Sequence, residues 1–231
     1  LFPFALLATA HFSPPLSCGT AVVGGGWAGV YAAWRLVVDA KSVPPSDVCL
    51  FEARKAVGGR TYSVNVQDLT LDIGAYRFGK GMHLPGDLIQ NVYNLSLACY
   101  EPSCTPDPEF NQVLYKIVDA DGHNAGYATP IRRMLKDLED AKVRIYYDHE
   151  LTGLYDTAEV AAAASKSTSL HFAGGATAVA DAVLLNLPRV AIERLDPLSI
   201  LFEAGPKAPA YQILRNCTPC TDGSGGGSPS T

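Results

Sequence analysis

The chain has 231 residues, of which 48% are hydrophobic and 18% charged, and its formal net charge at pH 7 is −5. This length and apolar content are enough for one large domain or two small ones with a buried core. The acidic balance and the lack of a Lys/Arg run disfavour nucleic acid as a partner. Beyond the N-terminal region, no uncharged apolar run is long enough to predict a transmembrane span.

The first ten residues, LFPFALLATA, form an apolar stretch that begins with Leu. Such a run fits the apolar part of a secretory signal whose basic start is missing, with a disordered arm as the alternative. We therefore expect residues 1–18 to be a partial signal or an arm. The signal interpretation predicts a secreted or extracytoplasmic protein, with the cytoplasm as the alternative. The opening Leu indicates a fragment, a processed form or a partial gene model.

A glycine-rich turn follows the first predicted strand. The segment TAVVGGGWAG, residues 20–29, combines an apolar run, the pattern Gly-x-Gly-x-x-Gly and the start of a helix expected to reach Asp39. In dinucleotide-binding folds such glycines, here Gly24, Gly26 and Gly29, permit the turn, leave room for the phosphates and let the helix pack on the strand. The helix N-terminus then offers N–H groups to a pyrophosphate. A plain tight turn is the alternative.

A second apolar run, Val48–Phe51, ends at Glu52, which lies 23 residues beyond Gly29. An acid at this place in a dinucleotide fold hydrogen-bonds a ribose diol. It also repels a 2′-phosphate, so NADP is disfavoured. A surface glutamate that happens to end a strand is the alternative.

The next segment separates two cofactors. It reads ARKAVGGRT over residues 53–61 and places a second glycine pair before Arg60. An NAD-dependent dehydrogenase has no general need for this pair, whereas a two-dinucleotide-fold flavoprotein passes its chain back along the pyrophosphate here. The chain resembles the flavin-containing amine oxidase family, whose N-terminal signature reads much like VVGGGWAGVYAAWRL…LFEARKAVGGRTYS. The resemblance implies FAD as the cofactor, and an NAD-linked reductase is the less favoured alternative.

A second resemblance concerns the substrate. The segment LDIGAYRF, residues 71–78, is similar to the stretch of L-amino-acid oxidases that runs beneath the flavin and ends with an arginine binding the substrate carboxylate. Monoamine oxidases have a similar stretch without that arginine. Arg77 is therefore the candidate for carboxylate binding, because a guanidinium matches a carboxylate with two charge-assisted bonds. A structural ion pair is the alternative, and Asp72 is expected to be a turn or cap residue.

The motifs and the resemblance together define the expected cofactor-binding residues. They are Gly24, Gly26, Trp27, Ala28, Gly29, Glu52, Ala53, Arg54, Gly58, Gly59, Arg60, Gly74, Ala75, Tyr76, Arg77 and Leu151. The resemblance implies that Leu151 contacts the adenine through its backbone and that the strand ending at residues 186–188 returns to the cofactor. No metal site is expected.

The remaining elements are predicted from apolar spacing. A helical stretch at 88–97, a strand at 113–118, a helix at 130–141 and a strand at 143–147 come first, followed by a hairpin or loop at 161–167 and strands at 170–173 and 182–186. One short helix is expected within 188–201, and His83 is expected in a surface loop.

The six cysteines allow two local disulfides if the protein is exported. The close pairs are Cys99 with Cys104 and Cys217 with Cys220, while Cys49 reads as a small buried apolar residue. Asn94 and Asn216 begin possible glycosylation sequons.

We thus expect an α/β fold, a Rossmann-like FAD-binding domain of the two-dinucleotide-binding-domain flavoprotein type, with a shortened, incomplete substrate domain. The expected segments are an arm (1–18), a first FAD-binding segment (19–78), a partial substrate domain (79–129), a second FAD segment (130–204) and a disordered tail (205–231). The family's C-terminal flavin motif has no match here.

The resemblance implies an FAD-dependent oxidoreductase that oxidises the CH–NH2 group of amino acids or amines while O2 is reduced to H2O2. Its partners would be the small-molecule substrate and O2. The alternative is a non-catalytic nucleotide-binding fragment of such an oxidase.

Overall fold

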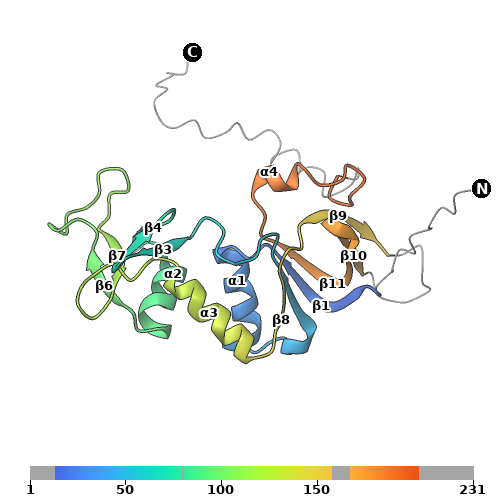
Figure 1. The fold of residues 1–231 in the computed structure, drawn as a ribbon, viewed down its shortest axis with the longest axis horizontal. Helices are drawn as coiled ribbons and strands as arrows, with labels where there is room; N and C mark the ends of the chain where they lie inside the picture. Colours follow the sequence, from blue (N-terminus) through green and yellow to red (C-terminus); the bar gives the residue numbers. More distant parts are fainter. Residues whose placement is uncertain (1–13, 80, 158–166, 203–231) are drawn as a thin grey trace, which may run out of the picture. The chain divides into compact units, whose positions relative to one another are not determined.

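The computed structural model describes residues 14–79, 81–157 and 167–202. These residues, drawn as a ribbon in Figure 1, cluster into two compact units. The larger unit comprises residues 18–150 and 181–187, and the smaller comprises residues 151–180 with the described residues before 18 and after 187. The expected signal, the 205–231 tail, Asn216 and the Cys217/Cys220 pair lie outside the described residues, as does most of the expected loop at 161–167.

A parallel sheet forms the centre of the larger unit. Its strands are β1 (Leu16–Val23), β2 (Val48–Phe51) and β8 (Arg144–Tyr146), with β2 between the other two. Every side chain of β2 is buried, as expected for a strand covered on both faces. β1 begins at Leu16, so the predicted arm at 1–18 is wrong at its C-terminal end.

Two helices pack together within this unit. α1 (Trp27–Trp34) continues into a π-helical turn at Arg35–Asp39, and α3 (Thr129–Asp140) lies beside α1 (Figure 1). Both helices contribute buried side chains to one core cluster with β1 and β2. The Trp34 Nε1 atom also donates a 2.9 Å hydrogen bond to the Asp137 carboxylate. The predicted helices at 27–39 and 130–141 are therefore confirmed.

A second, smaller core lies under an antiparallel sheet of β5 (Phe78–Gly79), β7 (Leu114–Val118) and β6 (Ser96–Cys99), with β7 in the middle. α2 (His83–Asp87) and a π-helical turn at Leu88–Val92 precede β6. The predicted helix at 88–97 is thus wrong beyond Val92. Asn94 adopts a left-handed conformation (φ 47°), which ends the helical turn. His83 is exposed but begins α2 instead of lying in a loop.

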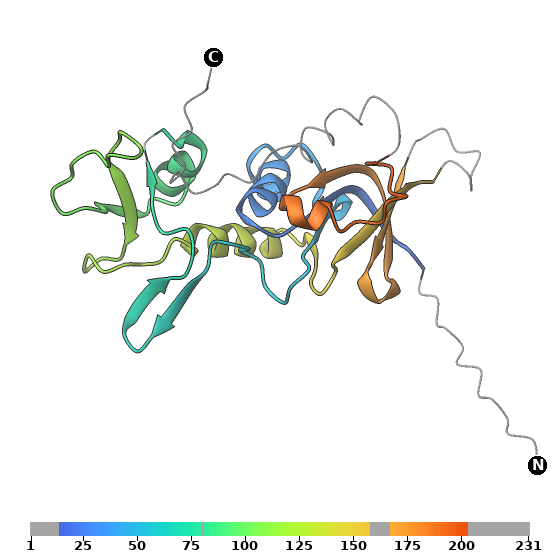
Figure 2. The same ribbon diagram turned by 90° about the horizontal axis from the view of Figure 1, so that it is seen from above.

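The hairpin of β3 (Ser63–Val66) and β4 (Leu69–Asp72) was not expected (Figure 2). Its polar face bonds to the rest of the larger unit. The Asp72 carboxylate accepts hydrogen bonds from Ser63 Oγ, Asn124 Nδ2 (2.9 Å) and the Tyr127 amide (2.8 Å). Asp72 is therefore an anchor for the hairpin, which corrects its expected role as a turn or cap residue.

The smaller unit is built on antiparallel strands. β10 (Thr168–Phe172) pairs with β9 (Leu151–Asp156) and with the first part of β11 (Thr177–Leu185), across a 3-10 turn at Ala173–Gly175. A short helix, α4 (Arg189–Ile192), follows β11, as expected. Another 3-10 turn, Pro45–Asp47, precedes β2 in the larger unit. None of the helices in the described part of the chain combines the length and apolarity needed to span a membrane.

Two disulfides join described residues. Cys99 and Cys104 form the local disulfide expected for an exported protein. Cys49 is disulfide-bonded to Cys18, which corrects its interpretation as a free apolar residue. This pair was not predictable from spacing, because the two cysteines are 31 residues apart and meet only when β1 and β2 become neighbours.

Candidate functional site

The first glycine segment forms a tight turn between β1 and α1. Gly24 has φ 102°, and a Cβ there would lie 2.3 Å from the backbone oxygen of Asn186. A Cβ on Gly29 would lie 1.9 Å from the Gly24 oxygen. Because both contacts involve backbone atoms, neither position tolerates a side chain without moving the chain. The helix therefore packs on the turn as the sequence predicts.

The N-terminus of α1 has no side-chain cap. Gly26 precedes the helix in an extended conformation, it has no side chain to cap the helix, and no acidic residue lies in the first turn. The first amide N–H groups of a helix have no acceptor within the helix itself. They and the positive end of the helix dipole make this terminus suited to an anion.

Glu52 follows β2, and its carboxylate faces the glycine turn. Its Oε2 accepts a 2.7 Å hydrogen bond from the Gly25 amide, and its Oε1 accepts a 2.9 Å bond from the Arg54 amide. Glu52 is only 7% exposed. Each oxygen keeps a second lone pair, so the carboxylate holds the turn in place and retains acceptor capacity for a further donor.

The second glycine segment lies directly against the first. The Gly58 amide donates a 2.7 Å bond to the Gly25 carbonyl, and Gly26 forms an isolated parallel β-bridge with Gly58. A Cβ on Gly59 would lie 3.4 Å from Gly26 Cα. Gly58 and Gly59 both have positive φ, at 124° and 58°. The structure thus brings together the two glycine segments that the sequence analysis assigned to one pyrophosphate.

Exposed side chains and a third segment border this turn. Ala53, Arg54 and Arg60 are exposed, and neither arginine is in an ion pair with a described residue. The Ala75 amide donates a 3.1 Å bond to the Arg60 carbonyl, and a Cβ on Gly74 would lie 2.0 Å from that oxygen. The predicted residues 74–76 therefore run beside Arg60.

The Arg77 side chain contacts a carboxylate and aromatic rings of this same chain. Its Nη1 donates a 3.1 Å hydrogen bond to the Asp107 carboxylate, and the two side chains are only 21% and 16% exposed. The guanidinium also lies 5.1 to 5.5 Å from the ring centroids of Tyr76, Tyr100 and Phe110. This is the structural ion pair that the sequence analysis kept as an alternative to substrate binding.

Sequence reasoning missed the side chain of Asn186. Its Nδ2 donates a 3.2 Å hydrogen bond to the Gly24 carbonyl, while its backbone N–H donates a 2.8 Å bond to the Val23 carbonyl. The end of this strand therefore lies beside the glycine turn, and its expected return to the cofactor stays a prediction. The signal available was an Asn immediately after an apolar strand. Leu151 begins β9 in the smaller unit and is buried there, and its contact with adenine stays a prediction.

An apolar groove opens beside α1. It has a volume of about 260 Å³ and is lined by Trp27, Ala28, Tyr31, Thr61, Leu84, Pro85 and Tyr127. The Trp27 and Tyr127 rings stack with centroids 5.2 Å apart. Burial raises the pKa of Tyr127 to about 12. The groove lies next to the helix N-terminus, where Trp27 and Ala28 belong to both features.

Three side chains elsewhere have the geometry of possible metal ligands. Asp119, Asp121 and His123 are exposed, and one ligand atom from each lies within 4.8 Å of the others. The Asp119 carboxylate accepts bonds from the Asp121 and His123 amides, so the turn explains why these residues cluster.

Comparisons with known proteins agree with this geometry. A family model described as an NAD(P)-binding Rossmann-like domain matches residues 22–88. The larger unit contains a Rossmann-like domain. No curated protein sequence matches the chain.

Solved structures of putrescine oxidase match the Rossmann-like domain and much of the remaining chain. The enzyme bound to putrescine matches with a TM-score of 0.55 and 12% identity over 79% of this chain and 61% of that one. A double mutant of the enzyme gives 0.59 and 12% over 87% and 64%. The chain shares this fold, as the resemblance to amine oxidases implied, and spans about 60% of the length of these structures.

Proposed function

We propose that this chain is the FAD-binding part of an oxidoreductase of the amine oxidase type. The observation that carries the proposal is the contact of Gly58 and Gly59 with the glycine turn at the start of α1. A single glycine turn serves NAD as well as FAD. A second glycine pair that lies against it, followed by an arginine without an ion pair to any described residue, fits the two-dinucleotide-fold flavoproteins that the sequence resembles.

The residues present fit the pyrophosphate and ribose of FAD. Amide groups at the N-terminus of α1 would hold the pyrophosphate, where the two glycine segments leave no Cβ to block it. Arg60 would add a positive charge. The free lone pairs of Glu52 would accept from a ribose diol. When bound, FAD would take the two electrons removed from a CH–NH2 group and pass them to O2, giving H2O2.

The geometry of Arg77 favours amines over amino acids as substrates. A carboxylate-binding arginine must present its guanidinium to the substrate, whereas here Asp107 and three aromatic rings already surround it. Putrescine, the ligand of one structural neighbour, is likewise an amine without a carboxylate. We therefore propose a primary amine as the substrate, with amino acids as the competing class.

Titration of the purified chain with FAD tests cofactor binding. We expect saturable quenching of flavin fluorescence, with NADH competing weakly. Replacing the exposed Arg60 by Gln should weaken FAD binding about fivefold or more, because a charge-assisted contact to phosphate is lost. Arg133→Gln, which removes an exposed arginine of α3 far along the chain, is the matched control and should bind FAD like wild type. Equal affinity for FAD in both variants would contradict the assignment of Arg60.

A non-catalytic nucleotide-binding role is the second candidate. The observation that favours it is that the glycine turn and Glu52 together fit the pyrophosphate and ribose that any dinucleotide contains. Peroxide release after adding putrescine or amino acids to the FAD-loaded chain separates the two candidates. FAD binding without peroxide supports the second, and peroxide from amino acids alone would overturn our choice of substrate class.

We also propose that the protein resides in an oxidising, extracytoplasmic compartment. The two disulfides support this location, since such bonds persist mainly in secreted and exported proteins. Asn94, which begins a possible glycosylation sequon, is exposed.

A further inference from the structure

The disulfide between Cys18 and Cys49 links the two strands that carry the candidate nucleotide-binding residues. Cys18 lies in β1, six residues before Gly24, and Cys49 lies in β2, three residues before Glu52. Cys49 is fully buried, whereas Cys18 keeps 5% of its surface exposed. Both cysteines are buried, and Cys18 is the less buried of the two.

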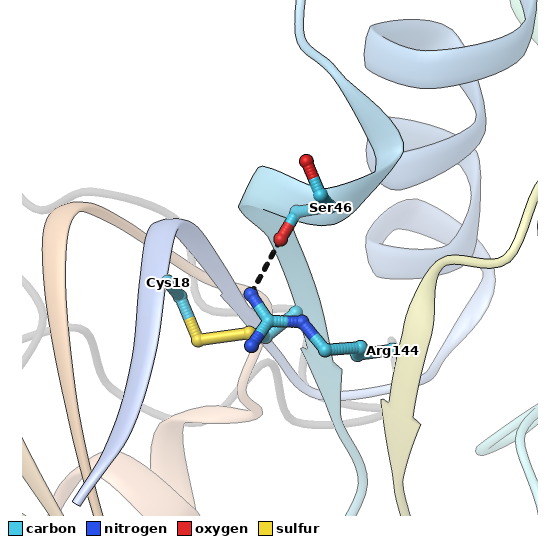
Figure 3. Close-up of a disulfide and its surroundings, with 4 residues drawn as sticks. Cys18, Ser46 and Arg144 are labelled. Carbon is cyan, nitrogen blue, oxygen red and sulfur yellow. Dashed lines mark hydrogen bonds between the residues drawn. A yellow bond between two sulfur atoms is a disulfide. The ribbon is translucent and has the colours of Figure 1, made fainter.

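A positive charge lies beside the buried sulfur. Arg144 stands directly opposite Cys49 in the parallel register of β2 and β8, and side chains opposite each other in a parallel sheet point to the same face. Figure 3 shows the Arg144 side chain extended toward the disulfide, with its guanidinium bonded to Ser46. That bond runs from Nη2 to the Ser46 carbonyl at 2.6 Å.

In the described part of the chain, no ion pair balances the charge on Arg144. Its Nε is buried and has no hydrogen-bond partner. Among the residues that the structure describes, no carboxylate forms an ion pair with this guanidinium. An unpartnered buried donor on a cation carries a free-energy cost, and a negative charge formed on Cys49 would lower that cost.

We infer that Cys18–Cys49 is a thiol–disulfide exchange site for a dithiol reductant, in which Cys18 is attacked and Cys49 leaves as a thiolate stabilised by Arg144. The attacking thiolate forms a bond to Cys18 Sγ, the Sγ–Sγ bond breaks, and its electron pair goes to Cys49 Sγ. The second thiol of the reductant then displaces Cys18. In total, the protein disulfide gains two electrons and two protons, and the dithiol becomes a disulfide.

The direction of attack follows from access and charge together. Exchange is faster when the leaving sulfur forms a more stable thiolate and when the attacked sulfur is accessible. A neighbouring arginine stabilises a thiolate. Both conditions favour the same assignment, because Cys18 is the less buried cysteine and Cys49 is the one opposite Arg144.

Reduction kinetics of the folded chain test this inference. The chain is made with Cys217→Ser and Cys220→Ser, treated with dithiothreitol in excess, quenched with N-ethylmaleimide and analysed by peptide mass mapping. The Cys99–Cys104 disulfide, in the same molecule, is the internal control. Arg144→Gln should slow reduction of Cys18–Cys49 by about threefold or more, because the leaving thiolate loses its neighbouring positive charge. Arg144→Lys, which keeps the charge, should restore most of the rate, and Arg133→Gln should change neither disulfide.

Several results would overturn the inference. One is an unchanged rate in Arg144→Gln, and another is a Cys18–Cys49 bond that resists the dithiol while the chain stays folded. A further measurement does not depend on Arg144 variants. In Cys18→Ser, we expect the pKa of the remaining Cys49 thiol to lie below the ordinary thiol value of about 8.5. Thiolate absorbance at 240 nm follows this titration. A pKa above 8.5 would show that burial outweighs the effect of the arginine, and it would contradict the assignment of Cys49 as the leaving thiolate. None of these readouts involves FAD, so they stand apart from the proposed oxidase function.

Discussion

At the scale of single residues, Glu52 has a structural role that precedes any cofactor. Its carboxylate accepts bonds from the Gly25 and Arg54 amides while almost fully buried. An acid at this position of a dinucleotide fold is usually considered for its bond to ribose. Here the same side chain also fixes the glycine turn, so its loss affects folding and binding together.

We therefore predict that Glu52→Ala lowers the free energy of unfolding by about 2–4 kcal/mol, because two amide donors lose their acceptor. Urea denaturation followed by circular dichroism measures the change. Glu150→Ala removes an exposed carboxylate from the same unit and should stay within about 0.5 kcal/mol of wild type. A similar small effect for Glu52→Ala would show that water satisfies both amides.

Tyr127 gives a pH-dependent prediction. Burial raises the pKa of this phenol to about 12, whereas an unfolded tyrosine titrates near pH 10. Between these values the unfolded state releases a proton that the folded state retains, so stability is full below about pH 10 and falls as pH rises toward 12. The stability difference between wild type and Tyr127→Phe should shift by about 2–3 kcal/mol over this range. Tyr62→Phe, at a 56% exposed position, should show no such shift.

The residues that sequence reasoning located well are those whose role depends on nearby backbone. Gly24 is needed because its φ is 102°, and Gly29 because a Cβ there would lie 1.9 Å from the Gly24 oxygen in the same turn. Arg77 was harder, because its partner Asp107 is thirty residues further on and meets it only when the strands between them fold. Spacing identifies a charged residue, but a distant partner decides whether that charge is free.

At the scale of elements, the β3–β4 hairpin reverses the usual pattern. Leu69, Leu71 and Ile73 alternate along the chain, which ordinarily indicates side chains facing a core, yet all three are exposed, at 62%, 44% and 61%. The opposite, polar face packs inward through Ser63 and Asp72. The alternation fits a strand here but does not show which face is buried, because hydrogen bonds to distant segments decide that.

Asp72 is the residue on which this orientation depends most. Replacing Asp72 by Ala should cost about 2–4 kcal/mol, since the Tyr127 amide and the Asn124 side chain lose a charged acceptor. Amide hydrogen exchange should also become faster in β3 and β4 than in α1. Asp68→Ala, in the exposed hairpin turn, is the control and should leave both measurements unchanged. Equal protection of the hairpin in both variants would argue that backbone pairing alone holds it.

At the scale of the whole chain, each unit combines segments that are separate in the sequence, whereas the segments expected from the sequence were continuous. Residues 18–150 and 181–187 cluster together, so a strand end far along the chain completes the unit that begins with the glycine turn. The Rossmann-like part was predictable because its strand, turn and helix follow each other directly. Which later residues join this unit was not predictable, because a strand from any distance along the chain can pair with the sheet.

The two disulfides close loops of very different length in the chain. Cys18–Cys49 closes a loop that spans 31 residues and contains all of α1, whereas Cys99–Cys104 spans 5. If a disulfide stabilises mainly by restricting the unfolded chain, its contribution grows with loop length. We predict that Cys18→Ser with Cys49→Ser lowers the free energy of unfolding by about 3–4 kcal/mol, against about 2 kcal/mol for Cys99→Ser with Cys104→Ser. Urea unfolding of the two double variants measures both. The reverse order would mean that native packing around the short loop, and not chain entropy, sets what each bond contributes.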